Sequence, residues 1–454
     1  MSDPKTTPVA WMQAEGRNPG DGGETGAPDS AALHPGYGAM SYEGWECRRI
    51  GEIFKIGSGE AAAYRSNDFS GPVIVYGANG PIGSHDESNF GPGYLIGRVG
   101  AAGFVNRVSV KVWASDNTLT LVPITDKCEP NFAGFLLEFI DPQSLVTKTA
   151  QPLVTQTGLA NVEAFIPTRI EEQRRIAEIL DTLDDAIQKT EQLIAKLKQI
   201  KQGLLHDLLT RGIDENGQLR DPIAHPEQFK DSVVGRIPKE WEVCALETVA
   251  QIERGKFAHR PRNDPRFYGG EFPFVQTGDI TAAQGEIFSN YSQTLNARGA
   301  AVSRSFPENT IAITIAANIA DTGILGIPMY FPDSVVGAIV HKPHSVRFVE
   351  LAIRLSKYRL DARAPQSAQK NINLRDLRPL LISLPTPQEQ FKIAEVYEAY
   401  VDRISTERQH IQKLNTIRKA LMYDLLTGKV RVGPKAMKEM IRQVASSKQV
   451  ARME

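Results

Sequence analysis

Apolar residues recur three and four positions apart over two long stretches of the chain, with two steps of seven in each. This spacing puts them on one face of an α-helix, so each stretch predicts a single apolar stripe. At 1.5 Å per residue, about 40 residues form a rod of roughly 60 Å, and such a rod cannot bury its stripe alone. The stripe residues are Ile176, Ile179, Leu183, Ile187, Ile194, Leu197, Leu204 and Leu208 in the first stretch, and Ile393, Val396, Tyr400, Ile404, Ile411, Leu414, Leu421 and Leu425 in the second.

The two stretches are copies of each other. When Gln173 is placed on Gln390, residues 173–213 and 390–430 align without a gap, and 16 of the 41 positions are identical. Each copy opens with a proline and an acidic first turn, and each ends in glycine within two residues of a threonine, which are helix start and stop signals. A repeat of this kind indicates an internal duplication in which the chain runs globule, helix, globule, helix.

Two arrangements would bury the stripes. Long helices of this type most often dimerise between chains, and that interpretation stays open at this point. Two similar helices joined by about 170 residues can also pair antiparallel within one chain. We expect the second arrangement, an antiparallel coiled coil with pseudo-twofold symmetry and a single copy of the chain in any complex.

The segments outside the helices predict two globular domains of the α+β class. Short β-like runs such as Pro72–Tyr76, Val108–Trp113 and Val335–Val340 are separated by Gly and Asn turns, and helical patterns occur near 132–140 and 347–361. The predicted division is a disordered N-terminal extension (1–40), a first globular domain (41–165), a central repeat helix (166–212), a linker (213–236), a second globular domain (237–383), a C-terminal repeat helix (384–430) and a C-terminal tail (431–454).

The two globular segments share a frame but not their contents. Trp45-Glu46 precedes Gly59 by the same spacing that separates Trp241-Glu242 from Gly255, whereas the interiors differ strongly. A constant frame with variable contents is what two recognition modules with different targets would show. Drift after duplication would produce the same pattern, and one sequence does not decide between the two.

Charge is nearly balanced over the whole chain, with 52 basic and 53 acidic residues, but it is unevenly distributed. Residues 254–266 hold five basic residues and one acid, whereas residues 41–165 hold nine basic and 13 acidic residues. The three cysteines lie far apart and fit neither a disulfide framework nor a metal site. With no long apolar run and no signal-peptide pattern, we expect a cytoplasmic protein that does not contact a membrane.

Loops carry the residues that we expect to contact nucleic acid. Arginine and lysine bind phosphates, while arginine also reads guanine, and asparagine or glutamine reads adenine. A solvated surface loop is the commoner role for any single residue of this kind, but the cluster at 254–266 favours nucleic-acid contact. The candidates are Asn79, Arg98 and Asn117 in the first globular domain, and Arg254, Lys256, Arg260, Arg262, Asn263, Arg266, Gln276, Thr277, Arg304, Gln369, Lys370 and Asn371 in the second.

Motifs for catalysis are missing from the sequence. Gly428-Lys429 is followed by valine, so the chain has no phosphate-binding P-loop, and no Gly-x-Gly-x-x-Gly follows a predicted strand. The aromatic tetrad of amino-methyltransferases and a nuclease carboxylate pattern are also missing, and the histidines at 341 and 344 have no third metal ligand nearby. We therefore predict no catalytic residues, no metal site and no cofactor in this chain.

The duplicated layout resembles the specificity subunit of type I restriction-modification systems. The resemblance covers residues from about 41 to 430 and rests on the Glu-Gln-x-x-Ile-Ala-Glu helix starts at Glu172 and Glu389, the Leu-Leu-Thr ends, and Gly-x-Ile-Pro-x-x-Trp at Gly235–Trp241. Each motif alone is weak, whereas the duplicated layout is specific. The extension at residues 1–40 departs from the family pattern.

The resemblance implies a DNA-recognition subunit with two target-recognition domains, each reading one half of a split double-stranded site. It further implies that two methyltransferase subunits carrying S-adenosylmethionine dock on the chain, often with restriction subunits that translocate DNA and use ATP and Mg²⁺. A scaffold or regulator without base readout is the alternative from another class. A combined methyltransferase and nuclease is disfavoured by the missing motifs.

Overall fold

The computed structural model describes residues 43–147, 152–316, 318–363 and 371–432, which form two compact units. Unit 1 contains the chain up to Leu183 together with the part that begins at Arg418, and unit 2 contains Asp184–Ile417. The predicted extension at 1–40 and nearly all of the predicted tail at 431–454 lie outside the described residues. Each long helix contributes one part to each unit, so the units do not follow the linear order of globule and helix.

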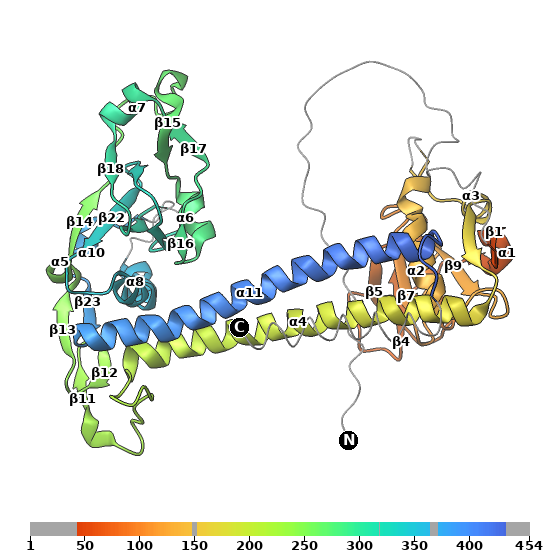
Figure 1. Cartoon of the computed structure of the whole chain (residues 1–454), viewed down its shortest axis with the longest axis horizontal. Helices are drawn as coiled ribbons and strands as arrows, with labels where there is room; N and C mark the ends of the chain where they lie inside the picture. Colours follow the sequence, from red (N-terminus) through yellow and green to blue (C-terminus); the bar gives the residue numbers. More distant parts are fainter. Residues whose placement is uncertain (1–42, 148–151, 317, 364–370, 433–454) are drawn as a thin grey trace. The chain divides into compact units, whose positions relative to one another are not determined.

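Unit 1 contains two four-stranded sheets and a separate two-stranded ribbon (Figure 1). Its helices are α1 (Ile50–Ile53), α2 (Pro130–Ile140), the 3-10 turn η2 (Pro142–Leu145), α3 (Gln156–Ala160) and the first part of α4 (Ile170–Thr210). Its strands are β1 (Trp45–Arg49), β2 (Phe54–Ser58), β3 (Arg65–Ser66), β4 (Val73–Gly77), β5 (Gly80–His85), β6 (Gly93–Gly97), β7 (Val105–Val108), β8 (Trp113–Ala114), β9 (Thr118–Pro123) and β10 (Glu163–Pro167).

The two sheets of unit 1 lie in successive layers on the helices. The large sheet has the order β2-β9-β6-β7, and the small sheet has the order β3-β5-β4-β8. Alternate residues of β6 face opposite sides, as the pleat requires. Tyr94 and Ile96 join the core that contains α2 and the long helices, whereas Leu95 joins the separate core under the small sheet. The outer face of the small sheet is therefore the face farthest from the helical layer of this unit.

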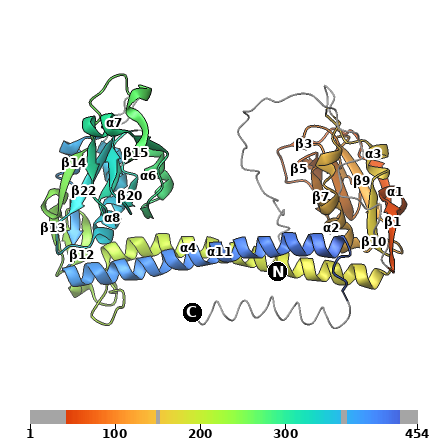
Figure 2. The same ribbon diagram turned by 45° about the horizontal axis from the view of Figure 1, so that its top comes forward.

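Unit 2 repeats this plan (Figure 2), with one five-stranded sheet, one four-stranded sheet and two two-stranded ribbons. Its helices and turns are η3 (Pro226–Gln228), α5 (Leu246–Val249), η4 (Pro265–Phe267), α6 (Thr277–Ala283), α7 (Ala297–Val302), α8 (Val346–Leu355), α9 (Lys357–Arg363), α10 (Leu374–Leu377) and the first part of α11 (Pro387–Leu426). Its strands are β11 (Phe229–Ser232), β12 (Gly235–Pro238), β13 (Glu242–Ala245), β14 (Ala250–Arg254), β15 (Tyr268–Phe274), β16 (Ile287–Phe288), β17 (Gln293–Leu295), β18 (Arg304–Phe306), β19 (Ile311–Thr314), β20 (Thr322–Leu325), β21 (Met329–Phe331), β22 (Val335–Val340) and β23 (Leu381–Leu384).

The large sheet of unit 2, β14-β22-β19-β20-β16, again separates the helices from a small sheet, β17-β15-β21-β18. Ile311 and Ile313 on β19 pack towards α8 and the long helices, while Ala312 between them faces the other core. A third hydrophobic cluster, formed by Phe257, Phe274 and Leu295, packs residues of the small sheet against the loop that follows β14. The fold class predicted from sequence, two mixed helix-and-sheet domains with two long helices, is confirmed.

Within each unit the two long helices share one core in antiparallel order. In unit 1 the start of α4, with Ile176 and Leu180, packs with Leu425 near the end of α11. In unit 2 the end of α4, with Leu208, packs with Ile393 near the start of α11. All 16 stripe positions are buried or partly buried, so the predicted stripe is confirmed as a packing face. Knobs-into-holes packing remains a prediction.

A buried carboxylate anchors the start of α4 in unit 1. Trp45 Nε1 donates to Glu172 Oε1 at 3.3 Å, and the Arg431 guanidinium donates to both oxygens of Glu172 at 2.8 and 3.0 Å. Arg431 follows the end of α11, so this Trp–Glu–Arg clamp ties the beginning of one long helix to the end of the other.

The same clamp recurs in unit 2 with the roles of the helices exchanged. Trp241 Nε1 and the Arg220 guanidinium donate to Glu389 at 3.0 and 2.5 Å, and the backbone N–H of Ile213 donates to the same carboxylate at 2.9 Å. Gly212, with a φ of +66°, lets the chain turn directly over the clamp, because a Cβ there would lie 2.4 Å from Glu389 Oε1. The glycine helix stop predicted from sequence therefore has a packing role as well.

Several predicted boundaries differ from the structure. The segment 166–212 begins with the end of β10, so α4 starts only at Ile170, and Leu384 likewise still belongs to β23. The predicted strand Val108–Trp113 is wrong, because residues between β7 and β8 turn the chain from the large sheet to the small one. The segment called a linker, 213–236, contains β11 and the start of β12, which pair as an antiparallel hairpin.

Candidate nucleic-acid interface

The basic loop of unit 2 is anchored by one aromatic side chain. The loop follows β14, and its Phe257 is buried against Phe267, Tyr268 and Phe274, with ring centroids 5.5 to 6.1 Å apart. The backbone N–H of Lys256 donates to the oxygen of Phe331 on β21 at 3.0 Å and holds the beginning of the loop. Because the anchor is apolar, the charged side chains on both sides of it point away from the core and stay exposed.

Three arginines of this loop converge on one acid. Arg260 and Arg262 place Nη2 at 2.8 and 2.5 Å from Asp333 Oδ2, and Arg254 Nε donates to the backbone oxygen of Asp333 at 2.5 Å. The side chains of Arg260 and Arg262 remain 52% exposed. A guanidinium carries five N–H donors, so the bond to Asp333 orients each arginine and leaves donors for another acceptor.

The far end of the loop carries a second acid–base cluster. Arg266 donates to both oxygens of Asp264, and its hydrogen bonds hold the pKa of Asp264 well below the usual carboxyl range. His259 Nε2 lies 3.0 Å from the same carboxylate and stacks on Phe267 at 4.1 Å. Since a lowered pKa keeps the carboxylate ionised, this pairing is fully formed at neutral pH and is lost only on acidification.

The remaining candidates of unit 2 fall into separate places. Arg304 pairs with Glu253 at 2.8 Å and joins the Asp333 group, because it also donates to the backbone oxygen of Arg254. Gln276 and Thr277 begin α6, where Gln276 donates to Gln293 at 3.0 Å. Lys256, Asn263 and Asn371 are exposed, and Gln369 and Lys370 lie outside the described residues. The structure therefore gathers Arg254, Arg260, Arg262 and Arg304 into one surface and leaves the others apart.

The three candidates of unit 1 lie together at one edge. Arg98 donates its backbone N–H to the oxygen of Asn117 at 2.8 Å. Asn79 is in the β4–β5 turn, and its neighbour Ala78 approaches Gly97, where a Cβ would lie 2.7 Å from the Ala78 oxygen. All three side chains are exposed. This edge has a single basic residue among the three, which agrees with the acidic balance of the domain.

Asp333 was missed by sequence reasoning. It is an isolated acid in a Phe-Pro-Asp-Ser run, more than 65 residues from the loop that it organises. No local pattern identifies such a residue, because its role depends on a β-turn placed next to the loop by the fold of the sheet.

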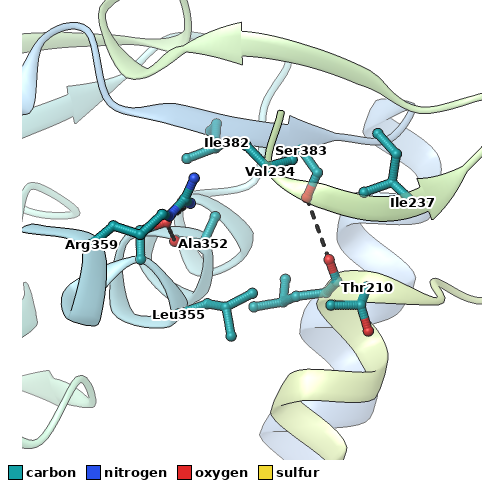
Figure 3. A pocket seen from close by; sticks show the side chains of 10 residues that line it. Thr210, Val234, Ile237, Ala352, Leu355, Arg359, Ile382 and Ser383 are labelled. Carbon is teal, nitrogen blue, oxygen red and sulfur yellow. Dashed lines mark hydrogen bonds between the residues drawn. The ribbon is translucent and has the colours of Figure 1, made fainter. Parts of the chain in front are cut away.

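The structure offers little room for a small-molecule ligand at the base of unit 2. The hollow in Figure 3, where the end of α4 meets α8 and β23, has a volume of about 30 Å³, enough for a water molecule rather than a metabolite. Ser383 donates across it to the backbone oxygen of Leu209 at 3.4 Å. Among the residues described, we find no group of three or more metal-ligating side chains. No helix in that part of the chain is long and apolar enough to cross a membrane.

The family model for the type I restriction modification DNA specificity domain matches twice, at residues 42–199 and 238–416. The chain belongs to this family. It is accordingly a bipartite DNA-recognition subunit of a restriction-modification system, non-catalytic and without a cofactor of its own. We refer below to the globular parts of units 1 and 2 as the first and second specificity domains.

Two curated proteins of the archaeon Methanocaldococcus jannaschii are similar to the chain. A protein assigned as the MjaX specificity subunit is 28% identical over 324 residues, which cover 70% of this chain and 72% of that protein. The MjaVIII specificity subunit is 24% identical over 433 residues, which cover 87% and 95%. The HindI specificity subunit of Haemophilus influenzae is 22% identical over 62% of this chain and 71% of its own.

Solved structures show the same fold at low sequence identity. The S subunit of a type I system from M. genitalium aligns with a TM-score of 0.53 at 16% identity, covering 84% of this chain and 96% of that one. A chain from a study of complex assembly and conformational transition in the type I R-M system aligns with a TM-score of 0.54, covering 86% and 99%.

Proposed function

We propose that each specificity domain reads one half of a split DNA site and that one copy of this chain docks two methyltransferase subunits on its long helices. Family membership establishes DNA recognition by two domains. The finer proposal is supported mainly by the repeated Trp–Glu–Arg clamp. In each unit this clamp attaches the domain to the start of one long helix through equivalent hydrogen bonds.

In the second domain we assign DNA contact to the surface around Asp333. Arg254, Arg260 and Arg262 present oriented guanidinium groups there, and Lys256 adds a charge at the same loop. Orientation by an acid suits an arginine that reads guanine, because such readout depends on two parallel N–H donors at fixed positions. In the first domain, Asn79, Arg98 and Asn117 remain candidates. Arg98 would contact a phosphate, and the amides of Asn79 and Asn117 would contact bases.

Docking of partner subunits is supported by a second apolar row on the helices. Leu193 and Ile200 are seven residues apart on one face of α4, and they are 38% and 40% exposed, although the stripe towards α11 is already covered. Phe391 on α11 is 56% exposed. Exposed apolar side chains on the long helices are compatible with a surface that binds another protein, because such surfaces are rich in exposed apolar groups. We assign this face to the methyltransferase subunits, which would carry S-adenosylmethionine in the cytoplasm. A restriction subunit, where present, would bring ATP and Mg²⁺.

An exchange of one specificity domain tests the proposal. Residues 237–383 would be replaced by the matching segment of a relative, and the chain would be co-expressed with methyltransferase subunits. We expect a pull-down to retain two methyltransferase subunits per chain, and sequencing of methylated positions to show one altered half-site. An exchange that alters both halves would contradict the assignment of one half to each domain, and binding without any sequence preference would favour a scaffold instead.

A further inference from the structure

The small sheet of the first specificity domain carries an open hollow of about 230 Å³ between β3 and the end of β5, the strands labelled in Figure 2. It lies on the sheet that is farther from the helical layer of unit 1, as the separate cores show. Its lining combines one basic, one acidic and two ring-bearing side chains with small residues: Ala63, Tyr64, Arg65, Ser84, His85 and Asp86.

Arg65 is oriented inside this hollow by an acid. Its Nη2 donates to both oxygens of Asp86 at 2.7 and 3.0 Å, and its side chain is 45% exposed. Among the described residues, the structure shows no acceptor for its Nε and Nη1. Gly71 lies next to the guanidinium, and a Cβ there would be 2.7 Å from Arg65 Nη1. Asp86 therefore fixes the position of the guanidinium, while its other N–H groups can donate to a ligand.

Ring-bearing side chains complete the hollow. His85 packs against Trp113, with ring centroids 4.3 Å apart and ring planes tilted by 36°, and its Nδ1 lies 2.9 Å from the backbone nitrogen and 3.1 Å from the backbone oxygen of Glu87. Tyr64 is 39% exposed at the rim.

The second domain contains a related combination in the loop and the turn η4 that precede its small sheet. His259 stacks on Phe267 at 4.1 Å, and Arg266 next to it is paired with Asp264 at 2.6 Å. The two domains differ strongly in sequence between their shared frames, yet each places a histidine against an aromatic ring close to an arginine that is paired with an acid. This shared set of side chains supports a common task.

We propose that the hollow at Arg65 is a base-reading site of the first specificity domain and that Arg65, held by Asp86, recognises guanine in duplex DNA. This inference rests on the proposed function. Guanine presents O6 and N7 as adjacent acceptors in the major groove, which match two N–H groups of an oriented guanidinium. Asp86 offsets part of the positive charge, so the contact selects by geometry more than by charge. This suits a domain with nine basic and 13 acidic residues between positions 41 and 165.

The site also extends the footprint expected for this domain. Asn79 lies in the turn that precedes β5, and His85 lies at the opposite end of that strand. At about 3.3 Å per residue, the two ends are roughly 17 Å apart, a length of about five base-pair steps. The hairpin can therefore present both ends to one half-site.

The test uses the chain assembled with its methyltransferase subunits on cognate and singly substituted duplexes at several salt concentrations. We expect Arg65→Ala to weaken cognate binding about five- to 150-fold and to relax methylation at one guanine of the first half-site. Arg65→Lys should keep the salt dependence but lose the discrimination, because lysine lacks the paired donors. Arg48→Ala is the matched control, since Arg48 is 40% exposed and pairs with Glu46 at the same 2.7 Å but lies on β1.

Unchanged recognition of the second half-site in every variant reports that the chain is folded and assembled. The proposal is overturned if Arg65→Ala leaves affinity and methylation unchanged, or if it weakens all duplexes equally, which would make Arg65 a phosphate contact. It is also overturned if only methyltransferase retention falls, which would make the hollow a protein-docking surface. If the unaltered complex shows no bipartite preference, the proposed function itself fails, independently of Arg65.

Discussion

Units 1 and 2 hold their long helices by the same three side chains but secure their domains by different means. In unit 1 a bidentate pair joins α11 to α2, with Arg418 donating to Glu138 at 2.7 and 2.8 Å. In unit 2 the corresponding contact is a network centred on the fully buried Glu350.

The network of unit 2 joins α8 to α11 through several charged groups. Glu350 accepts from Arg347, from Arg354 at 2.6 and 2.9 Å, and from Thr322 at 2.6 Å, and Arg354 also donates to Tyr397 on α11. Burial alone disfavours the charged guanidinium, but Glu350 and Tyr397 outweigh it and raise the pKa of Arg354. The comparison teaches that duplication preserved the clamp on the helices, whereas the attachment of each domain was rebuilt.

The largest difference between the units should appear when the central acids are removed. Glu350→Ala removes both carboxylate bonds of the partly buried Arg354 and one of the acids around the buried Arg347, which keeps Glu286 and Glu398. It should lower the free energy of unfolding of unit 2 by about 3–5 kcal/mol. The matched change in unit 1, Glu138→Ala, should cost less, because the Glu138 side chain is 40% exposed. Denaturant unfolding followed by tryptophan fluorescence would measure both. Equal losses would show that the two attachments are energetically alike despite their geometry.

Replacing the glutamate of each clamp should cause a smaller loss of folding stability, and this loss should differ between the two units. Glu389→Gln weakens the bonds to Arg220, Trp241 and the Ile213 backbone, whereas Glu172→Gln affects only Arg431 and Trp45. Because hydrogen bonds to charged groups contribute about 1.5–3 kcal/mol each, we expect a loss of about 2 kcal/mol for Glu389→Gln and about 1 kcal/mol less for Glu172→Gln. Thermal unfolding of both variants checks the order. Equal losses would mean that the extra backbone bond contributes nothing, and the reverse order would contradict the prediction.

The remaining prediction concerns DNA binding rather than folding stability, through the basic loop of the second domain. If Arg262 reads guanine, Arg262→Ala should cost about 1–3 kcal/mol of binding and relax one position of the second half-site only. If it contacts phosphate, binding should weaken evenly across sequences and the salt slope should fall by about 1. We expect phosphate contacts to be the majority among the loop cations. Arg236→Ala on the linker hairpin is the control. If Arg262→Ala binds DNA as the control does, the loop does not contact DNA and is an ordinary solvated surface.

Sequence periodicity predicted the long helices because a stripe of apolar residues is a local property of the chain. Each stripe position is at least partly buried, and β4 and β22 lie where the β-like runs Pro72–Tyr76 and Val335–Val340 predicted strands. The Val108–Trp113 prediction failed for a physical reason. A run of β-forming residues favours extended backbone, but it does not say that the chain crosses from one sheet to another within that run.

Duplication, fold class and the DNA-recognition role were therefore determined by the sequence itself, since repeats and helix periods are visible without contacts. Tertiary structure alone decided that Arg431 and Arg220 close clamps on the opposite helix. It also decided that Asp333 gathers three arginines and that Asp86 holds Arg65 beside His85. These partners are separated by about 20 to 260 positions in the chain, and their attraction acts only after folding has brought them within a few ångströms, where charge and hydrogen-bond geometry become effective.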